Sequence, residues 1–324
     1  MLAAAMIAAV LSACGGGGSA TVSDQRPAAG VLDDVPAYAG PVTPLPADVT
    51  RLYAASGNPF APRVVLFLQG GPVDMLSSAD QLDDLQVDWE DQLLVRVHQA
   101  NTLNPAIVGD PDLSYERAIR ENEQSVEILN RVIRHFAGQG KQVVVAGHSF
   151  GAFLILRAIA EHPDLQTLVD RFLVMNGRLD MPDVVWQSMR HGVQWKFPSG
   201  GDPAQTAVQP TRESREGDEY RGPGDLPLTN TFSWSQLKLQ ADIGRPRMTR
   251  VLAGRRLDRV VVVESTADEA VGRLSAAEKA FLKTAGAPLY CIQGGTHDSA
   301  FEAPYAAELT ALLLGATTQT RRCD

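Results

Sequence analysis

The chain has little positive charge for its length and few cysteines. Its 324 residues include 29 lysines and arginines against 38 aspartates and glutamates, a formal net charge of −9, and only three cysteines. Because nucleic-acid binding depends on clustered basic side chains, this balance argues against a nucleic-acid partner. No His, Cys and carboxylate residues have the spacing of a metal site. The sequence therefore predicts no metal and no organic cofactor.

A hydrophobic run of membrane-spanning length is also missing. The apolar stretch at residues 1–13 is too short to cross a bilayer as a helix. It leads into Leu-Ser-Ala-Cys at residues 11–14, which resembles the lipobox of bacterial lipoproteins. Four glycines and a serine at residues 15–19 are typical of a flexible tether. We therefore expect a signal peptide with lipobox at residues 1–14, acylation at Cys14, and a lipid-anchored protein of the bacterial cell envelope that faces the periplasm or the exterior.

Beyond the tether, apolar strands alternate with amphipathic helices. The expected strands are 63–68, 92–98, 142–146, 172–175, 259–263 and 288–292, and the expected helices are 115–136, 152–160, 275–284 and 303–314. Such alternation predicts a mostly parallel sheet covered by helices on both faces. Residues 15–47 have the composition of a linker, and residues 177–248 interrupt the alternation. We therefore predict an α/β core at 48–176 and 249–324 with an insertion between its two parts.

The motif Gly147-His148-Ser149-Phe150-Gly151 stands between an expected strand and an expected helix. A serine at such a tight turn protrudes, and glycines flank it because larger side chains would clash there. The N-terminus of the following helix favours a developing negative charge. These features predict that Ser149 is a nucleophile.

A serine nucleophile needs a base, and the base needs an orienting carboxylate. Asp268 follows the strand at 259–263, and His297 follows the last expected strand. The order serine, acid, histidine is the one that accompanies this turn motif, and the carboxyl ends of parallel strands meet at one edge of the sheet. We therefore predict Asp268 as the acid and His297 as the base, with Glu264, Glu269 and Asp298 left open as alternative acids.

A tetrahedral oxyanion also needs hydrogen-bond donors. One expected donor is the backbone N–H of Phe150, the residue after the nucleophile, and the other belongs to Gly70 or Gly71 after the strand at 63–68. Glycine there permits a close approach of the backbone.

Two cysteines remain if Cys14 carries lipid. Cys291 and Cys323 would form an even pair in an oxidising compartment, so a disulfide between them is expected. The alternative is two unrelated thiols, one of them in a buried strand.

Taken together, these motifs resemble the α/β-hydrolase superfamily over about residues 48–315. The loop Gln69-Gly70-Gly71-Pro72 is similar to the His-Gly-Gly-Pro-Gly loop of proline iminopeptidase relatives, although Gln69 and Val73 depart from that pattern. The resemblance implies an α/β-hydrolase fold with eight strands and a cap inserted after the sixth, where residues 177–248 stand. The motif around Ser149 departs as well, with Phe150 and Ala152 where those enzymes favour Trp and a further Gly. Because of these departures in the loop and in the motif, the resemblance does not extend to the substrate.

We expect a serine hydrolase that cleaves a small-molecule carboxylic ester through an acyl-enzyme. One alternative is an iminopeptidase-like amidase, in which cap carboxylates would hold a substrate amine. The candidates for that role are Glu213, Glu216, Asp218 and Glu219. The other alternative is a non-catalytic envelope binding protein with a hydrolase fold.

Overall fold

The computed structural model describes residues 38–76, 85, 91–205, 211–215, 219–221, 227–229 and 232–321. The predicted lipidation residue Cys14 and its leader lie outside these residues, as does Cys323. The predicted linker is described only from Tyr38 onward. None of the described helices combines the length and the apolar character that a membrane crossing requires.

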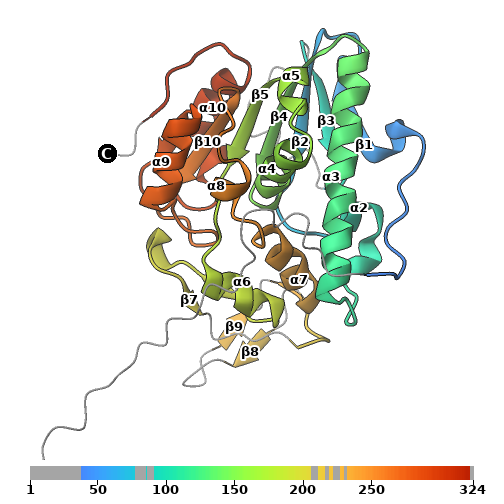
Figure 1. Ribbon diagram of the computed structural model, residues 1–324, viewed down its shortest axis with the longest axis vertical. Helices are drawn as coiled ribbons and strands as arrows, with labels where there is room; N and C mark the ends of the chain where they lie inside the picture. The colour runs from blue at the N-terminus through green and yellow to red at the C-terminus, as the bar shows by residue number, and fades with distance from the viewer. Residues whose placement is uncertain are drawn as a thin grey trace, which may run out of the picture.

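A seven-stranded sheet forms the centre of the molecule (Figure 1). In spatial order its strands are β1 (Tyr53–Gly57), β3 (Leu93–Val97), β2 (Arg63–Leu68), β4 (Gln142–His148), β5 (Val169–Met175), β10 (Val260–Ser265) and β11 (Leu289–Ile292). Every neighbouring pair is parallel except β1 with β3. The predicted mostly parallel α/β sheet is thus confirmed.

The strand count differs from the expectation drawn from the resemblance. Among the described residues the sheet has seven strands instead of eight, and the insertion follows the fifth strand in chain order instead of the sixth. One of the seven, the edge strand β1, was not among the predicted strands. Its sequence, Tyr-Ala-Ala-Ser-Gly, is half-buried to exposed and lacks the apolar run that identifies the central strands.

Helices cover both faces of the sheet. The helices of the described residues are α2 (Ala100–Leu103), α3 (Tyr115–Gly138), α4 (Phe150–Glu161), α5 (Leu165–Leu168), α6 (Asp183–Arg190), α7 (Trp234–Ile243), α8 (Met248–Val251), α9 (Ala276–Ala285) and α10 (Tyr305–Leu313), of which α6 and α7 belong to the insertion. Side chains alternate along each strand, so Val64 and Leu66 of β2 pack with α3 and α4, whereas Val65 and Phe67 belong to the core that includes α10. Burial on both faces explains why the central strands read as continuous apolar runs.

The described parts of residues 177–248 form several short elements at one end of the sheet. Helices α6 and α7 lie there beside two small hairpins (Figure 1). The hairpins are β6 (Trp195–Lys196) with β7 (Ala204–Gln205), and β8 (Glu219–Arg221) with β9 (Pro227–Thr229). This arrangement fits a cap, while the predicted domain boundaries stay a prediction.

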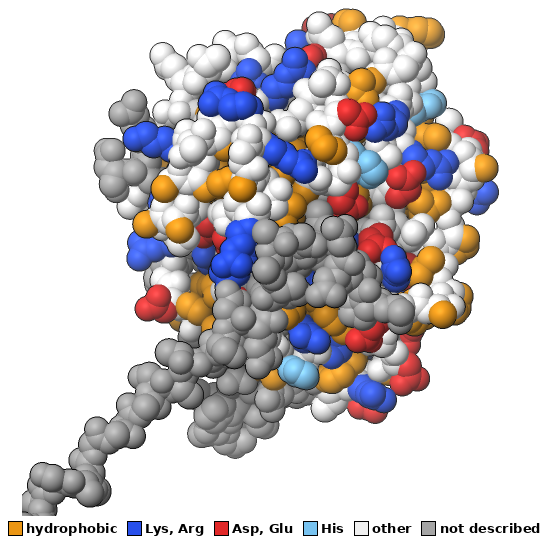
Figure 2. Space-filling model, viewed as in Figure 1, with side chains coloured by type: hydrophobic (Ala, Val, Ile, Leu, Met, Phe, Trp, Pro, Cys, Tyr) orange, Lys and Arg blue, Asp and Glu red, His pale blue; other side chains and the backbone are white. Residues whose placement is uncertain are grey.

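On the face shown in Figure 2, the acidic and basic side chains of the described residues are interspersed. That part of the surface does not gather charge of one sign.

Candidate active site

Ser149 stands at the turn between β4 and α4. Its φ is +51°, a left-handed conformation that non-glycine residues rarely adopt. A Cβ atom on Gly151 would collide with the Leu68 carbonyl, and one on Gly147 would lie 2.8 Å from the Gly151 backbone. Both glycines of the motif are therefore required by the packing of the turn. The Ser149 N–H donates to the Met175 carbonyl at 2.9 Å, which ties the turn to β5.

The structure brings Asp268 and His297 together. His297 Nδ1 lies 2.8 Å from Asp268 Oδ2. The other carboxylate oxygen of Asp268, which is 1% exposed, accepts the N–H groups of Ala270 at 2.8 Å and Val271 at 2.9 Å. Because a carboxylate only accepts, Nδ1 carries the proton and Nε2 is left with a free lone pair. The ring is therefore in the tautomer that a general base needs.

The three alternative acids make other contacts or face solvent. Glu264 accepts the Leu274 N–H at 2.9 Å and contacts Lys279 Nζ at 2.8 Å, so it is bound to the α9 region. The side chain of Asp298 is 71% exposed. Glu269 accepts the backbone N–H of His297 at 3.4 Å and does not contact its ring nitrogen.

Opposing effects act on the pKa of His297. Burial disfavours the charged ring, but the hydrogen bond and charge of Asp268 outweigh it, with smaller contributions from Asp298 and Glu269. The net result raises the pKa of His297 above its ordinary value. The imidazolium that forms during proton transfer is thereby stabilised.

Two residues that sequence reasoning missed hold the His297 backbone. His148 Nε2 donates to the His297 carbonyl at 3.0 Å, and Asn176 Nδ2 donates to the same oxygen. Burial lowers the pKa of His148 to about 3, so its ring is neutral and serves as a donor. His148 lies within the Gly147–Gly151 motif, but the sequence gives no sign that it contacts His297. Asn176, at φ +48° after β5, gave no sequence signal.

The expected oxyanion donors lie close to the serine. A Cβ atom on Gly70 would lie 3.3 Å from Ser149 Cβ, and Gly71 has a φ of +122°. The N–H groups of Gly70, Gly71 and Phe150 make no hydrogen bond within the described part of the chain. Phe150 begins α4, where a helix leaves its first N–H groups unpaired. These three groups are therefore available to a negatively charged oxygen.

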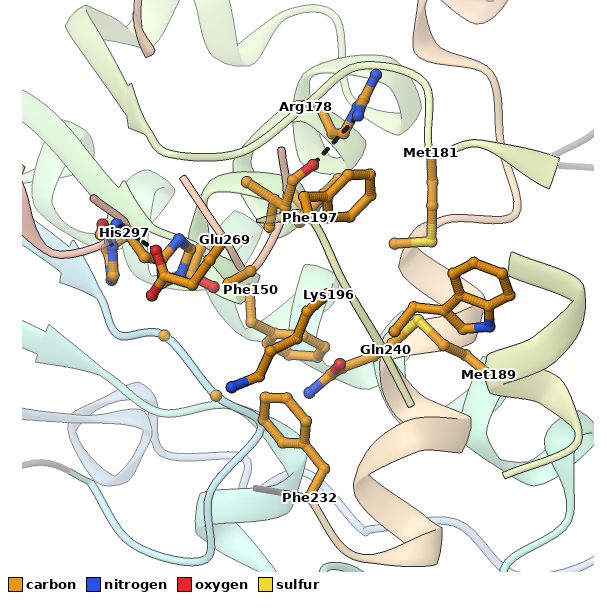
Figure 3. A pocket seen from close by; sticks show the side chains of 18 of the residues that line it. Phe150, Arg178, Met181, Met189, Lys196, Phe197, Phe232, Gln240, Glu269 and His297 are labelled. Atoms are coloured by element: carbon orange, nitrogen blue, oxygen red, sulfur yellow. Dashed lines mark hydrogen bonds between the residues drawn. The ribbon is translucent and has the colours of Figure 1, made fainter. Parts of the chain in front are cut away.

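A cavity of about 520 Å³ joins these groups to the insertion. Ser149, His297, Gly70 and Gly71 line one part of it. The rest of its wall is mostly apolar and includes Phe150, Phe153, Met181, Val185, Met189, Trp195, Phe197, Phe232 and Val271. Figure 3 shows His297 and Glu269 on one side and Met181 and Met189 on the other, with Lys196, Gln240 and Phe232 between them. Its size and lining suit a small molecule with an apolar portion.

Among the described residues, no three or more His, Cys, Asp or Glu side chains gather as a metal site would require. Cys291 of β11 is disulfide-bonded, and its backbone N–H donates to the Arg321 carbonyl at 3.0 Å. The chain end therefore runs beside β11 two residues before Cys323. Because Cys323 lies outside the described residues, its pairing with Cys291 stays a prediction.

Comparison with known proteins identifies similar sequences and folds. The model of the alpha/beta hydrolase family matches residues 109–309. The peroxisomal alpha-beta-hydrolase Lpx1 of Saccharomyces cerevisiae is 13% identical over 83% of each chain, with a TM-score of 0.50. Est1E from Butyrivibrio proteoclasticus is 14% identical over 81% of this chain and 93% of that chain, with a TM-score of 0.47. At these identities the structural likeness concerns the fold alone. No curated protein matches the sequence significantly.

Proposed function

Because this chain belongs to the alpha/beta hydrolase family, we propose that it cleaves small-molecule carboxylic esters with Ser149 as nucleophile. One observation carries the proposal: the hydrogen-bonded pair Asp268 and His297 opens onto the same cavity as Ser149. An oriented imidazole and a serine that line one cavity are what acyl transfer requires.

The reaction proceeds in two halves. Ser149 Oγ attacks the ester carbonyl carbon, and His297 Nε2 takes its proton. The N–H groups of Phe150 and of Gly70 or Gly71 hold the oxyanion, and the alcohol leaves with the proton from His297. Water then attacks the acyl-enzyme with His297 again as base, which releases the acid and restores the serine.

Ser149 Oγ makes no hydrogen bond to His297 in this structure. Catalytic hydrogen bonds of this kind are often long until substrate binds, so the proposal requires a small rotation of the serine side chain.

Esters are favoured over amides for two reasons. An alcohol leaving group needs less protonation than an amine, and the cavity wall is largely apolar, with Glu269 and Asp298 as the carboxylates among its described lining residues. Of the carboxylates proposed for an amine site, Glu216 and Asp218 lie outside the described residues. The side chain of Glu219 is likewise outside the described part of the chain, and Glu213, which is described, does not line the cavity.

Labelling with a fluorophosphonate tests the nucleophile. The wild-type protein should be modified at Ser149, located by peptide mass spectrometry. Ser149→Ala should keep its thermal unfolding midpoint and lose about 10⁶-fold in kcat on p-nitrophenyl esters. Labelling at another residue, or a Ser149→Ala variant within about threefold of wild type, would contradict the assignment.

We also propose that Cys14 carries a lipid anchor at the cell envelope. The support is the Leu-Ser-Ala-Cys sequence at residues 11–14 followed by the glycine tether. The intact mass of the mature protein should show an acylated cysteine at a new N-terminus, and Cys14→Ser should leave the protein outside the membrane fraction. An unmodified mature N-terminus would refute the anchor.

A further inference from the structure

The loop that carries Gly70 and Gly71 is held by side-chain amides from two separate parts of the chain. Three backbone carbonyls of the loop each accept a hydrogen bond from a carboxamide nitrogen. The pairs are Gln99 Nε2 with the Gln69 carbonyl at 2.9 Å, Gln236 Nε2 with the Pro72 carbonyl at 2.7 Å, and Asn101 Nδ2 with the Val73 carbonyl at 2.6 Å. The donor residues are at most 1% exposed.

These hydrogen bonds act on the part of the loop beside the serine. The Gln69 carbonyl and the Gly70 N–H belong to one planar trans peptide, so they point in opposite directions. A hydrogen bond that fixes the carbonyl toward Gln99 therefore also fixes the direction of the Gly70 N–H. Gly71 stands between this peptide and the held carbonyl of Pro72. The two candidate oxyanion donors of this loop, the N–H groups of Gly70 and Gly71, thus belong to a stretch of backbone that hydrogen bonds hold on both sides.

The anchoring amides are themselves fixed. Gln236 is in the first turn of α7, and its Oε1 accepts the Ser233 N–H at 2.6 Å. That contact accounts for its role in capping the helix, whereas the contact of its Nε2 with Pro72 goes beyond capping. Gln99 and Asn101 follow β3, and Asn101 Nδ2 also lies 3.4 Å from Gln99 Oε1. The loop is therefore held from the core and from the insertion at once.

We propose that Gln99, Asn101 and Gln236 are positioning residues that keep the oxyanion donors preorganised. The inference rests on the proposed function, because it assigns these residues to the oxyanion site of that reaction. Donors that are already oriented stabilise the transition state without reorganising when charge develops. Releasing the loop should therefore weaken binding of the tetrahedral state more than binding of the ester itself.

The test uses Gln99→Met and Gln236→Met, alone and combined, because methionine has a similar length and no amide. The readouts are kcat and KM for a p-nitrophenyl ester, and Ki for a trifluoromethyl ketone with the same acyl group, which forms a tetrahedral adduct with a serine. Each single variant should lose about 10- to 100-fold in kcat, as expected for a displacement of about 1 Å. Ki should rise by the same factor while KM stays within about threefold. The combined loss should be smaller than the product of the two, because both substitutions release one loop.

Asn104→Leu is the matched control. Its amide donates to Thr43 Oγ1 at 3.3 Å, immediately after α2 but away from the Gly70–Gly71 loop. It should leave kcat, KM and Ki unchanged. Should Gln236→Met fail to fold, Gln99→Met on the other element decides the question alone.

Different results overturn the two proposals. A wild-type protein that the ketone does not inhibit overturns both. If Ser149→Ala abolishes activity and the wild type is inhibited, but Ki of the methionine variants stays at the wild-type value, only the positioning role falls. The positioning role is also overturned if Ki changes in proportion to KM instead of kcat. The same holds if Asn104→Leu lowers kcat as much as the methionine variants do.

Discussion

The cavity has a floor built from the ends of strands and a roof built from the insertion, and the two are held by different interactions. On the floor, backbone groups fix the serine and the acid: the Ser149 N–H binds a carbonyl of β5, and Asp268 accepts two backbone N–H groups. The side chains of His148 and Asn176 hold the backbone of His297. In the roof, buried side chains hold α7 to the core. The positions of the serine and the acid thus follow largely from the fold itself, whereas the shape of the cavity depends on particular side chains.

Asp242 is the centre of the roof's attachment. It is fully buried and contacts Arg157 of α4 at 2.5 Å, Arg245 at 3.0 Å and Asn122 of α3 at 3.0 Å. Helix α6 is attached by other contacts: Trp186 Nε1 donates to the Tyr115 hydroxyl at 3.1 Å, and Asp183 pairs with Arg247 at 2.7 Å. The two roof helices therefore differ, and α7 also carries the amide that reaches the Gly70–Gly71 loop.

The largest expected effect is on kcat and comes from a change to a catalytic residue of the floor. Asp268→Asn should lower kcat by about 10⁴, because the amide favours the wrong tautomer of His297 while keeping the shape of the carboxylate. Steady-state kinetics with thermal unfolding checks this. Asp298→Asn, on an exposed side chain next to the base, is the control and should stay within about threefold of wild type. The reverse result, with Asp298→Asn inactive and Asp268→Asn active, would mean that the acid is misassigned.

The next-largest effect is on stability and comes from removing a buried carboxylate that holds the roof to the core. Asp242→Leu should lower the free energy of unfolding by about 3–5 kcal/mol, because the buried guanidinium groups of Arg157 and Arg245 would each lose a buried carboxylate that contacts them. Urea unfolding measures this directly. Asp258→Asn removes an exposed partner of Arg256 and should leave the unfolding midpoint unchanged. Equal midpoints for both variants would show that the buried network does not hold α7.

The floor could be predicted from the sequence because its signals are local. The Ser149 motif lies between an apolar strand and an apolar helix, and two later strands are each followed by a candidate triad residue. The structure shows the same elements with bounds that differ by up to three residues; β4, for example, runs to His148. The motif also predicts glycine on both sides of the serine, although the clash that requires Gly151 is with the carbonyl of Leu68 on another strand.

The roof could not be predicted in this way because its contacts are distant in sequence. Arg157 and Asp242 are 85 positions apart, and Gln236 and Pro72 are 164 positions apart. A buried glutamine or arginine has no local pattern that distinguishes it from an exposed one. Asn176 was missed for the same reason, since its partner His297 lies 121 positions away.

A third prediction sharpens the comparison between floor and roof, because it changes only the part of the cavity wall that the roof forms. Val185 of α6 lines the cavity and is 2% exposed, whereas its neighbour Val184 is 40% exposed and does not line it. Val185→Phe should fill part of the cavity and lower the ratio of kcat/KM for an octanoate ester to that for an acetate ester by about tenfold or more. Val184→Phe should leave the ratio unchanged. If both variants discriminate equally, α6 does not form the wall that the substrate meets.

The smallest expected effect concerns the pH dependence of the floor. His297 must be neutral to act as base, so kcat/KM should rise with pH through the pKa of His297, which lies above its ordinary value of 6.5. Asp268 is the main group that raises this pKa, and Glu269 contributes less. Glu269→Gln should therefore move the rising limb to lower pH, while the plateau of kcat/KM at high pH stays within about twofold of wild type.

Profiles of kcat/KM measured from about pH 5 to 9 at constant ionic strength test this, with the exposed Glu302→Gln as a control that should not move the limb. Because the charge of Glu269 favours the imidazolium, a limb that moves to higher pH, or one that stays in place, would show that this carboxylate does not act on the base.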